Sequence, residues 1–256
     1  MEYRYRAIGI VHSCFKEKFG TPRQAGLVPD ACGTLELFAP FNRREYVEGL
    51  EGFSHIWLQY VLHAATLAPR KSKVRPPRQG GNQRLGVFST RSNFRPNALG
   101  LSAVALERIV DNGHGVQLQL KGIDILDQTP VLDIKPYLPY ADCHPQALGG
   151  FAHTRPQAVL RVRLGARARV VLRRLANPDR RQLTRLLVQV LSLDPRPAYA
   201  ARMDRPRDYG MLLLDWNVRW RVTGATAVVT DLESHAAGWP VATEDGRRAS
   251  RRGTPF

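Results

Sequence analysis

Cysteine is scarce in this sequence, and its spacing is not that of a metal site. Cys14, Cys32 and Cys143 are odd in number and include no C-x-x-C pair. The sequence therefore predicts neither a zinc site nor a disulfide framework, and we expect a reducing, cytoplasmic environment. No apolar run reaches membrane-spanning length, and the opening stretch MEYRYRAIGI lacks the pattern of a secretory signal.

Several common catalytic signatures are also missing. No G-x-G-x-x-G follows a predicted strand, and no G-x-x-x-x-G-K-[ST] loop is present. These absences argue against the usual dinucleotide-binding and P-loop sites. The sequence also lacks H-E-x-x-H, G-x-S-x-G and any His/Cys set with metal-ligand spacing, so we expect no metal.

Basic residues outnumber acidic ones, and the excess is concentrated late in the chain. The 256 residues carry a net charge of +16, with a pI near 10.6. Residues 151–256 contain 20 Arg, no Lys and 9 acidic residues, a net charge of +11. This charge favours a nucleic-acid partner, because arginine binds phosphate through a planar fork. A basic surface that is merely solvated is the alternative.

Short β-branched and aromatic runs dominate the first 140 residues. They end at Gly, Pro, Asn or Asp, as strands do, and Asn112-Gly113 is a hairpin signal. Because no long helical pattern separates them, they predict a mainly β N-terminal domain, a barrel or a sandwich. We expect strands at Tyr5–Val11, Gly33–Phe38, His55–Leu62, Leu85–Ser89, Leu101–Ile109, Val116–Leu120 and Val131–Ile134.

The pattern changes near residue 150. Asn177-Pro178 is typical of an N-cap followed by the first helical residue, and apolar residues then recur at helical spacing. Asn217–Val222 and Ala227–Leu232 are predicted to form a closing pair of strands. The predicted division is a β domain over residues 1–150, a smaller α+β domain over 151–235 and a disordered arginine-rich tail over 236–256.

One polar group lies in the stretch TPVLDIKPY. Strand alternation places Asp133, Lys135 and Tyr137 on the same face, which then carries a carboxylate, an ammonium and a phenol. Pro136 confines this strand to an edge or a rim. We interpret the face as a site, with a charge pair on an exposed strand as the alternative.

A second polar group occupies the loop RSNFRPN, which contains Arg91, Asn93, Arg95 and Asn97. Arginine presents fixed donors to a carboxylate or a phosphate, and asparagine both donates and accepts at a heterocycle edge. We interpret the loop as ligand-binding. An Asx-turn with solvated arginines is the alternative.

Six motifs occur together in a fixed order. They are PRQ at Pro22–Gln24, FSHIW at Phe53–Trp57, VRPPR at Val74–Arg78, GVFSTRSNFRPN at Gly86–Asn97, TPVLDIKPYLP at Thr129–Pro139 and DPRPAY at Asp194–Tyr199. From about residue 5 to about residue 232, the chain resembles the bacterial TrmO (TsaA/YaeB-like) family of tRNA adenosine N6-methyltransferases. Ala98-Leu99 and Gln128 depart from the family's usual Pro-Ile and Gly, which affects the expected loop shape rather than the activity.

The resemblance implies a single-sheeted β-barrel, S-adenosylmethionine as cofactor, and a homodimer with the cofactor near the subunit interface. The implied substrate is adenosine 37 in the anticodon stem-loop of a threonine tRNA, already carrying an N6-threonylcarbamoyl group. The residues that match the family's cofactor site are Pro22, Arg23, Gln24, His63, Arg91, Leu101, Asp124, Ile125, Leu126, Asp127 and Thr129.

Asn97 and the DIKPY face match the family's catalytic edge. The implied acceptor is a ureido nitrogen with a delocalised lone pair, so a group that takes its proton would assist the reaction. Asp133 is the first candidate, with Lys135 and Tyr137 orienting the substrate. A purely structural role for Asp133 is the alternative.

Arginine and tyrosine side chains are the candidates for contacts with the tRNA. Lys135 and Arg95 suit the threonylcarbamoyl carboxylate, while Arg196 and Tyr199 suit a phosphate and an unpaired base. Two other functions remain open, an RNA-binding protein without catalysis and a methyltransferase of a small molecule. The acidic turn Asp124–Asp127 argues against the first, and the charge of residues 151–256 argues against the second.

Overall fold

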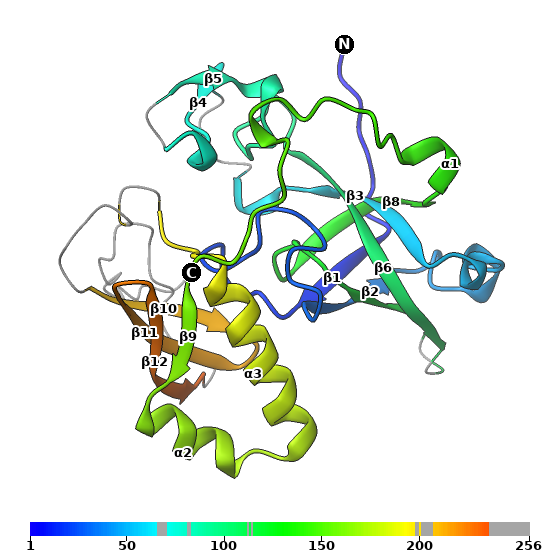
Figure 1. Cartoon of the computed structure of the whole chain (residues 1–256). Helices are drawn as coiled ribbons and strands as arrows, with labels where there is room; N and C mark the ends of the chain where they lie inside the picture. Colours follow the sequence, from blue (N-terminus) through cyan, green and yellow to red (C-terminus); the bar gives the residue numbers. More distant parts are fainter. Residues whose placement is uncertain are drawn as a thin grey trace, which may run out of the picture.

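A computed structural model describes residues 1–65, 71–80, 83–111, 113, 115–197, 200 and 207–235. Two bodies lie side by side in it, a β-barrel and a smaller domain of helices on a sheet (Figure 1). The predicted hairpin residue Asn112, Tyr199 and the predicted tail lie outside the described residues.

Six antiparallel strands close into the barrel in the order β1-β2-β7-β6-β3-β8. They are β1 Gly9–Ser13, β2 Cys32–Leu37, β3 His55–Val61, β6 Leu99–Asp111, β7 Val116–Lys121 and β8 Thr129–Pro136. Alternation explains the closed interior: Ile56, Leu58 and Tyr60 of β3 are buried, while His55 and Gln59 face outward. The prediction of a mainly β, barrel-forming N-terminal domain is confirmed.

Two predicted strands differ from the structure. The strand predicted at Tyr5–Val11 begins only at Gly9, because its pairing with β8 starts where Ile8 N donates to Val131 O. The strand predicted at Leu85–Ser89 is reduced to β5 Leu85–Gly86, which pairs with β4 Lys73–Val74 outside the barrel. It ends there because a 3-10 turn, η5 Val87–Ser89, follows and is closed by a hydrogen bond from Thr90.

Short helical segments connect the strands. The bounds are η1 Arg44–Tyr46, η2 Leu50–Gly52, η3 His63–Ala65, η4 Pro77–Gln79, α1 Pro139–Asp142 and η6 Gly150–Ala152. Among the described helices, none is both long and apolar enough to span a membrane.

The second domain is a four-stranded sheet in the order β10-β11-β12-β9, with two helices on it. The elements are β9 Arg161–Leu164, α2 Ala166–Arg174, α3 Asn177–Ser192, β10 Asp208–Leu213, β11 Trp216–Thr223 and β12 Thr226–Ser234. The predicted helix and closing strand pair are confirmed, but α2, β9 and β10 were not predicted. Asn177 is not the N-cap: Ala176 holds that position, and the Asn177 side chain accepts a hydrogen bond from Arg180 instead.

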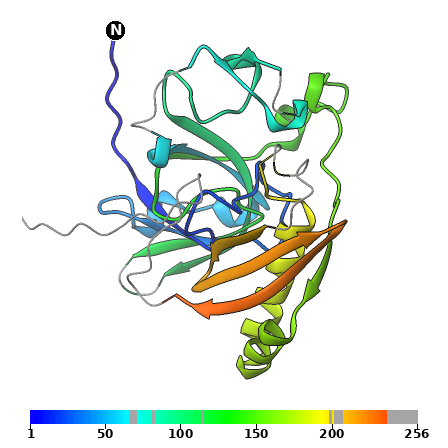
Figure 2. The same cartoon turned by 90° about the vertical axis from the view of Figure 1, so that its left-hand side faces the viewer.

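Helix α3 lies between the barrel and the sheet (Figure 1), and Figure 2 shows α3 behind the four-stranded sheet and α2 below it. Its apolar face is buried at 0–3% exposure, through Leu183, Leu186, Leu187, Val190 and Leu191. Its polar side touches the barrel domain, where Gln189 donates to Asp30 Oδ2 at 2.6 Å and accepts from Asp30 N at 3.1 Å. The helix therefore fixes one domain against the other.

Candidate functional site

A chain of hydrogen bonds joins β3 and β6 to the loop after β7. Tyr60 Oη lies 3.1 Å from Ser102 Oγ, and Ser102 Oγ donates to Asp124 Oδ1 at 2.7 Å. Gly100 lies opposite Tyr60 in the strand register, where any methyl group would overlap the Tyr60 ring. The glycine thus leaves the space in which this chain forms.

Opposing effects act on the pKa of the Asp124 carboxyl group. Burial raises its pKa, while hydrogen bonds from Ser102 and the Ala25 backbone and the charge of Arg91 act in the opposite direction. Burial likewise raises the pKa of Tyr60 to about 12, so this phenol stays protonated and can donate. A buried carboxyl with one cationic neighbour is a typical ligand-binding group.

Two predicted residues from distant loops meet beside this carboxyl. Arg91 Nη1 donates to Gln24 Oε1, and the Arg91 charge acts on Asp124. The loop Pro22–Gln24 and the loop RSNFRPN therefore converge, as the interpretation of both as parts of one site requires. Together they gather an amide, a guanidinium and a carboxylate.

A neighbouring group surrounds the turn after Asp124. Thr129 Oγ1 donates to Leu126 O at 2.6 Å and lies 3.3 Å from His63 Nδ1. Asp127 pairs with Lys16 Nζ at 3.0 Å. Burial lowers the pKa of His63 despite the nearby charge of Asp127, so the ring is neutral at neutral pH. The Ile125 side chain is 1% exposed and packs in the hydrophobic core.

Asp133, Lys135 and Tyr137 lie on the outer wall of the barrel. Asp133 and Lys135 are opposite Gln59 and Trp57 of β3, and the Tyr137 ring lies 5.7 Å from the Trp57 ring. The Asp133 and Lys135 side chains are 50% and 63% exposed and only 4.0 Å apart. The structure therefore brings these three predicted residues onto one face.

Leu101 extends that outer face on the next strand. It is 56% exposed and lies opposite Gln59, which has Asp133 on its other side. Leu99, two residues earlier, is 46% exposed. Leu99, Leu101, Gln59 and Asp133 define this outer face, whereas Ser102, the residue after Leu101, is buried and donates to Asp124.

Arg95 and Asn97 differ in their surroundings. Arg95 donates to Thr90 O at 2.7 Å and to Val87 O at 3.4 Å, and it lies over the Phe88 ring. Asn97 is exposed, and its backbone oxygen accepts from Leu99 N at 2.8 Å. Arg95 therefore shapes its own loop, whereas the Asn97 side chain faces solvent.

The DPRP stretch lies at the junction of the two domains. Arg196 binds Asp194 through two hydrogen bonds of 2.7 Å, and its side chain is 11% exposed. Burial lowers the pKa of the Arg23 guanidinium, and the charge of Asp194 acts in the opposite direction. The predicted residues Arg23 and Arg196 are thus both influenced by Asp194, but only Arg196 binds it.

Sequence reasoning missed Tyr60 and Ser102. The available signal was the alternation of β3, which puts Tyr60 in phase with the buried Ile56 and Leu58. A hydroxyl in a buried phase requires a hydrogen-bond partner. That requirement could have marked Tyr60, but only closure of the barrel brings Ser102 and Asp124 to it.

The fold and these residues define a barrel protein with a cluster of polar side chains around Asp124, joined to an arginine-rich domain. Residues 10–143 match the family described as tRNA-methyltransferase O N-terminal domain, and residues 157–235 match the TrmO C-terminal domain. The chain belongs to the TrmO family.

Relatives match the chain over both domains. It is 45% identical to the tRNA (adenine(37)-N6)-methyltransferase of Escherichia coli (strain K12), covering 90% of this chain and 98% of that protein. It is 46% identical to a Pseudomonas aeruginosa protein named "Putative S-adenosylmethionine-dependent methyltransferase RcsF", covering 86% and 93%. The crystal structure of TrmO from Pseudomonas aeruginosa is similar with a TM-score of 0.74 and 39% identity, covering 91% and 99%.

Proposed function

We propose that this protein is an S-adenosylmethionine-dependent tRNA (adenine(37)-N6)-methyltransferase. The observation that carries the proposal is agreement over 90% of the chain with a relative of that name, in both domains. The cofactor follows from a second relative, whose name specifies S-adenosylmethionine. The site agrees, because a buried carboxylate beside a guanidinium suits a charged small ligand.

The residues that converge around Asp124, in the loop after β7, fit the chemistry of the cofactor. S-adenosylmethionine carries a carboxylate, an ammonium and an adenine, and supplies a methyl group activated by a sulfonium. Arg91 would bind a carboxylate, Asp124 a cation, and Gln24 an adenine edge or an amino-acid group. The other predicted cofactor residues that would line the same site are Pro22, Arg23, His63, Leu126, Asp127 and Thr129. Ile125 would support it by packing in the core, and Leu101 would border it from the outer face of the barrel.

Within this activity, the acceptor that we propose is adenosine 37 of threonine tRNA bearing an N6-threonylcarbamoyl group. The ureido nitrogen must lose a proton as it is methylated, and the Asp133 carboxylate would accept it. Lys135 and Tyr137 would orient the acceptor, and Asn97 faces solvent at the end of the adjoining loop. Holding the nitrogen in line is the larger contribution to rate.

A homodimer would explain the outer face of the barrel. Leu99 and Leu101 are 46% and 56% exposed beside Gln59 and Asp133. A second subunit placed there would cover the apolar side chains and enclose Asp133, which is half-exposed in the single chain. The dimer and the cytoplasmic location are parts of the proposal.

The tRNA-binding surface that we propose is the arginine face of β9, α2 and α3. Nine arginines and a single acidic residue occur between Arg161 and Arg185. Most of these arginines are exposed, so phosphates can reach them. Arg196 would act less directly, because its guanidinium already binds Asp194.

Transfer of labelled methyl groups to threonine tRNA tests the proposal. The tRNA is supplied with and without its threonylcarbamoyl group, to wild type, Asp133→Asn and an exposed control, Glu48→Gln. We expect label at N6 of the carbamoylated tRNA only. Asp133→Asn should lower kcat about 100-fold, with cofactor affinity unchanged, as expected for loss of a general base.

The other outcomes separate the rival functions. Label on both tRNAs would remove the threonylcarbamoyl requirement but keep the activity. Cofactor binding without label on either tRNA would favour a methyltransferase of another substrate. A protein that binds tRNA but no cofactor would be an RNA-binding protein without catalysis.

A further inference from the structure

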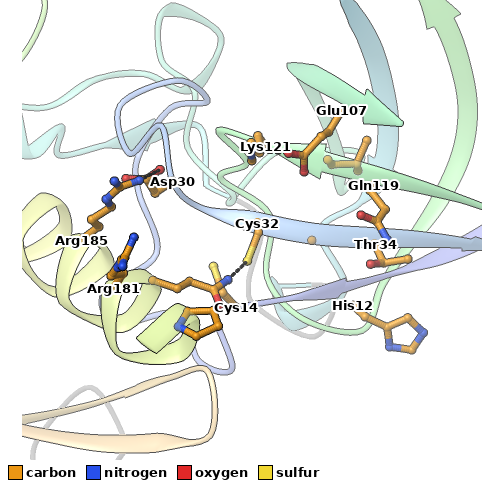
Figure 3. A pocket seen from close by; sticks show the side chains of 14 residues that line it. His12, Cys14, Asp30, Cys32, Thr34, Glu107, Gln119, Lys121, Arg181 and Arg185 are labelled. Carbon is orange, nitrogen blue, oxygen red and sulfur yellow. Dashed lines mark hydrogen bonds and ion pairs between the residues drawn. The ribbon is translucent and has the colours of Figure 1, made fainter. Parts of the chain in front are cut away.

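A cavity of about 610 Å³ lies between the barrel and helix α3, and Figure 3 shows the side chains around it. Among its described lining residues, none belongs to the candidate site above. Two of them are cysteines, Cys14 just after β1 and Cys32 at the start of β2. Cys32 is partly exposed and lines this cavity, so small solutes can approach it, whereas Cys14 is only 3% exposed.

The two cysteines face each other across antiparallel strands. Ser13 and Gly33 are register partners, so the next pair is Cys14 and Cys32, and Cys14 N donates to Cys32 O at 3.2 Å. Cα atoms directly opposite each other in antiparallel strands are about 4.5–5.5 Å apart. That separation lies within the range of about 4.4–6.8 Å that a disulfide needs.

Cys32 is the more reactive of the two thiols. It accepts hydrogen bonds from the Cys14 thiol and, at 3.0 Å, from Gln182 Nε2 of helix α3. These bonds, the one from Cys14 first, lower the pKa of Cys32 to about 7 against the effect of burial. The donated hydrogen bond and burial raise the pKa of Cys14. At neutral pH a substantial fraction of Cys32 is therefore thiolate, the form that reacts.

We propose that Cys14 and Cys32 are a peroxide-reactive dithiol, oxidised reversibly to a disulfide by hydrogen peroxide. The Cys32 sulfur attacks one peroxide oxygen, so that an S–O bond forms, the O–O bond breaks and hydroxide leaves to become water. The Cys14 sulfur then attacks the Cys32 sulfenic sulfur, and its proton leaves with the hydroxyl group as a second water. Two thiols and one peroxide thus give one disulfide and two waters.

The dithiol is connected to both domains. Cys14 O accepts from Leu214 N at 2.7 Å, and the adjacent Ser13 N donates to Asp127 Oδ1 at 2.6 Å. Oxidation draws the two sulfurs together and removes the thiolate that Gln182 binds. This expectation rests on the proposed function: the oxidised protein should bind the cofactor more weakly, because movement of Ser13 would displace the turn that contains Asp127.

The full chain treated with hydrogen peroxide, alkylated and digested with trypsin provides the test. Trypsin cuts after Lys16 and Arg23, so Cys14 and Cys32 fall in different peptides. We expect a linked peptide pair that forms before the exposed Cys143 is oxidised and disappears on reduction. Cys143 is the internal control for general thiol damage.

Three variants identify the roles. Cys14→Ser should leave Cys32 as a sulfenic acid that dimedone captures, and Cys32→Ser should leave Cys14 unoxidised at the same dose. Gln182→Leu should slow the linkage about tenfold, since a hydrogen bond to a charged sulfur is lost, while methyl transfer by the reduced protein stays at the wild-type level.

Prior oxidation of Cys143, or oxidation of Cys14 at the wild-type rate in Cys32→Ser, would overturn the proposal. Cofactor affinity is measured separately, by calorimetry on reduced and oxidised protein. A linked pair with unchanged affinity would overturn only the coupling to Asp127. A reduced protein that binds no cofactor would overturn the proposed function and leave the dithiol in place.

Discussion

The barrel domain withdraws one carboxyl group, that of Asp124, from most of the solvent, whereas the C-terminal domain keeps most of its arginines at the surface. In the barrel domain, Asp124 accepts a hydrogen bond from Ser102 and is influenced by the charge of Arg91. In the C-terminal domain, Leu186, Leu187 and Trp220 are 0% exposed, and arginines cover the outer surface of α2. A buried charge selects one ligand in one orientation, while exposed cations bind phosphates of many sequences. The barrel is thus suited to chemistry and the second domain to holding RNA.

The largest effect is expected from Asp124→Asn. The amide keeps the shape but removes the negative charge that faces Arg91, so cofactor binding should weaken about 100-fold, as for loss of a charge-assisted contact. Calorimetric titration with S-adenosylmethionine measures it, and Glu48→Gln, an exposed acid of the same domain, is the matched control. An unchanged affinity would place the cofactor elsewhere.

Gly100→Ala should have the next largest effect. It disrupts the Tyr60–Ser102–Asp124 hydrogen bonds without removing a charge. The new methyl group overlaps the Tyr60 ring, so the ring must move away from Ser102. Overpacking of this kind costs about 1–3 kcal/mol. Thermal unfolding measures the loss, and Gly52→Ala, where an added Cβ meets nothing within 4 Å, should melt with the wild type.

Replacing exposed arginines of α2 tests the other half of the comparison. Arg169, Arg173 and Arg174 changed together to Gln should weaken tRNA binding about tenfold and reduce the slope of log affinity against log salt by about 1 per lost phosphate contact. Cofactor affinity should not change. Changing the exposed Arg4 and Arg6 of the barrel domain to Gln is the control. An equal loss of tRNA affinity from both sets would contradict the assignment of tRNA binding to the C-terminal domain.

The smallest effect is expected from Glu17→Gln at the junction. Burial raises the pKa of Glu17 against a hydrogen bond from Leu212 N. A folded-state pKa above the unfolded one means that the native state binds the extra proton, so this stabilisation is complete below the unfolded pKa and lost as pH rises through the folded pKa. Glutamine keeps the acceptor without the charge, so Tm at pH 8 should rise by about 2–4 °C. Melting curves between pH 4 and pH 8 measure it, and a variant that is less stable at pH 8 would contradict the sign.

The elements that the sequence predicted are those with strong periodic burial. Alternation marked β3, and five apolar residues at helical spacing marked α3. Helix α2 was not predicted, because only Ala168 and Leu172 are buried in it, too few to produce a periodic pattern in the sequence. Strand β9 is four residues long and pairs in parallel with β12, a contact between residues far apart in the chain.

The sequence predicted the part of the candidate site that lies in local motifs. It did not predict the part that forms only when the barrel closes. The loops that hold Gln24 and Arg91 were singled out, and their contact agrees with that interpretation. The Tyr60–Ser102–Asp124 chain of hydrogen bonds depends on β3, β6 and the loop after β7 meeting when the barrel closes. Arg196 was assigned to the tRNA, yet it binds Asp194, a partner only two residues away that the local sequence DPR already offered.

Phe15 belongs to the barrel by sequence and to the C-terminal sheet by packing. It is 1% exposed and bridges Leu213, and nearby Phe19 stacks with Trp220 at 6.3 Å between ring centroids. One hydrophobic core therefore continues through both domains. In thermodynamic terms the two domains form a single cooperative unit, so the whole chain should melt in one calorimetric transition. A barrel expressed without the C-terminal domain would expose Phe15 and lose stability.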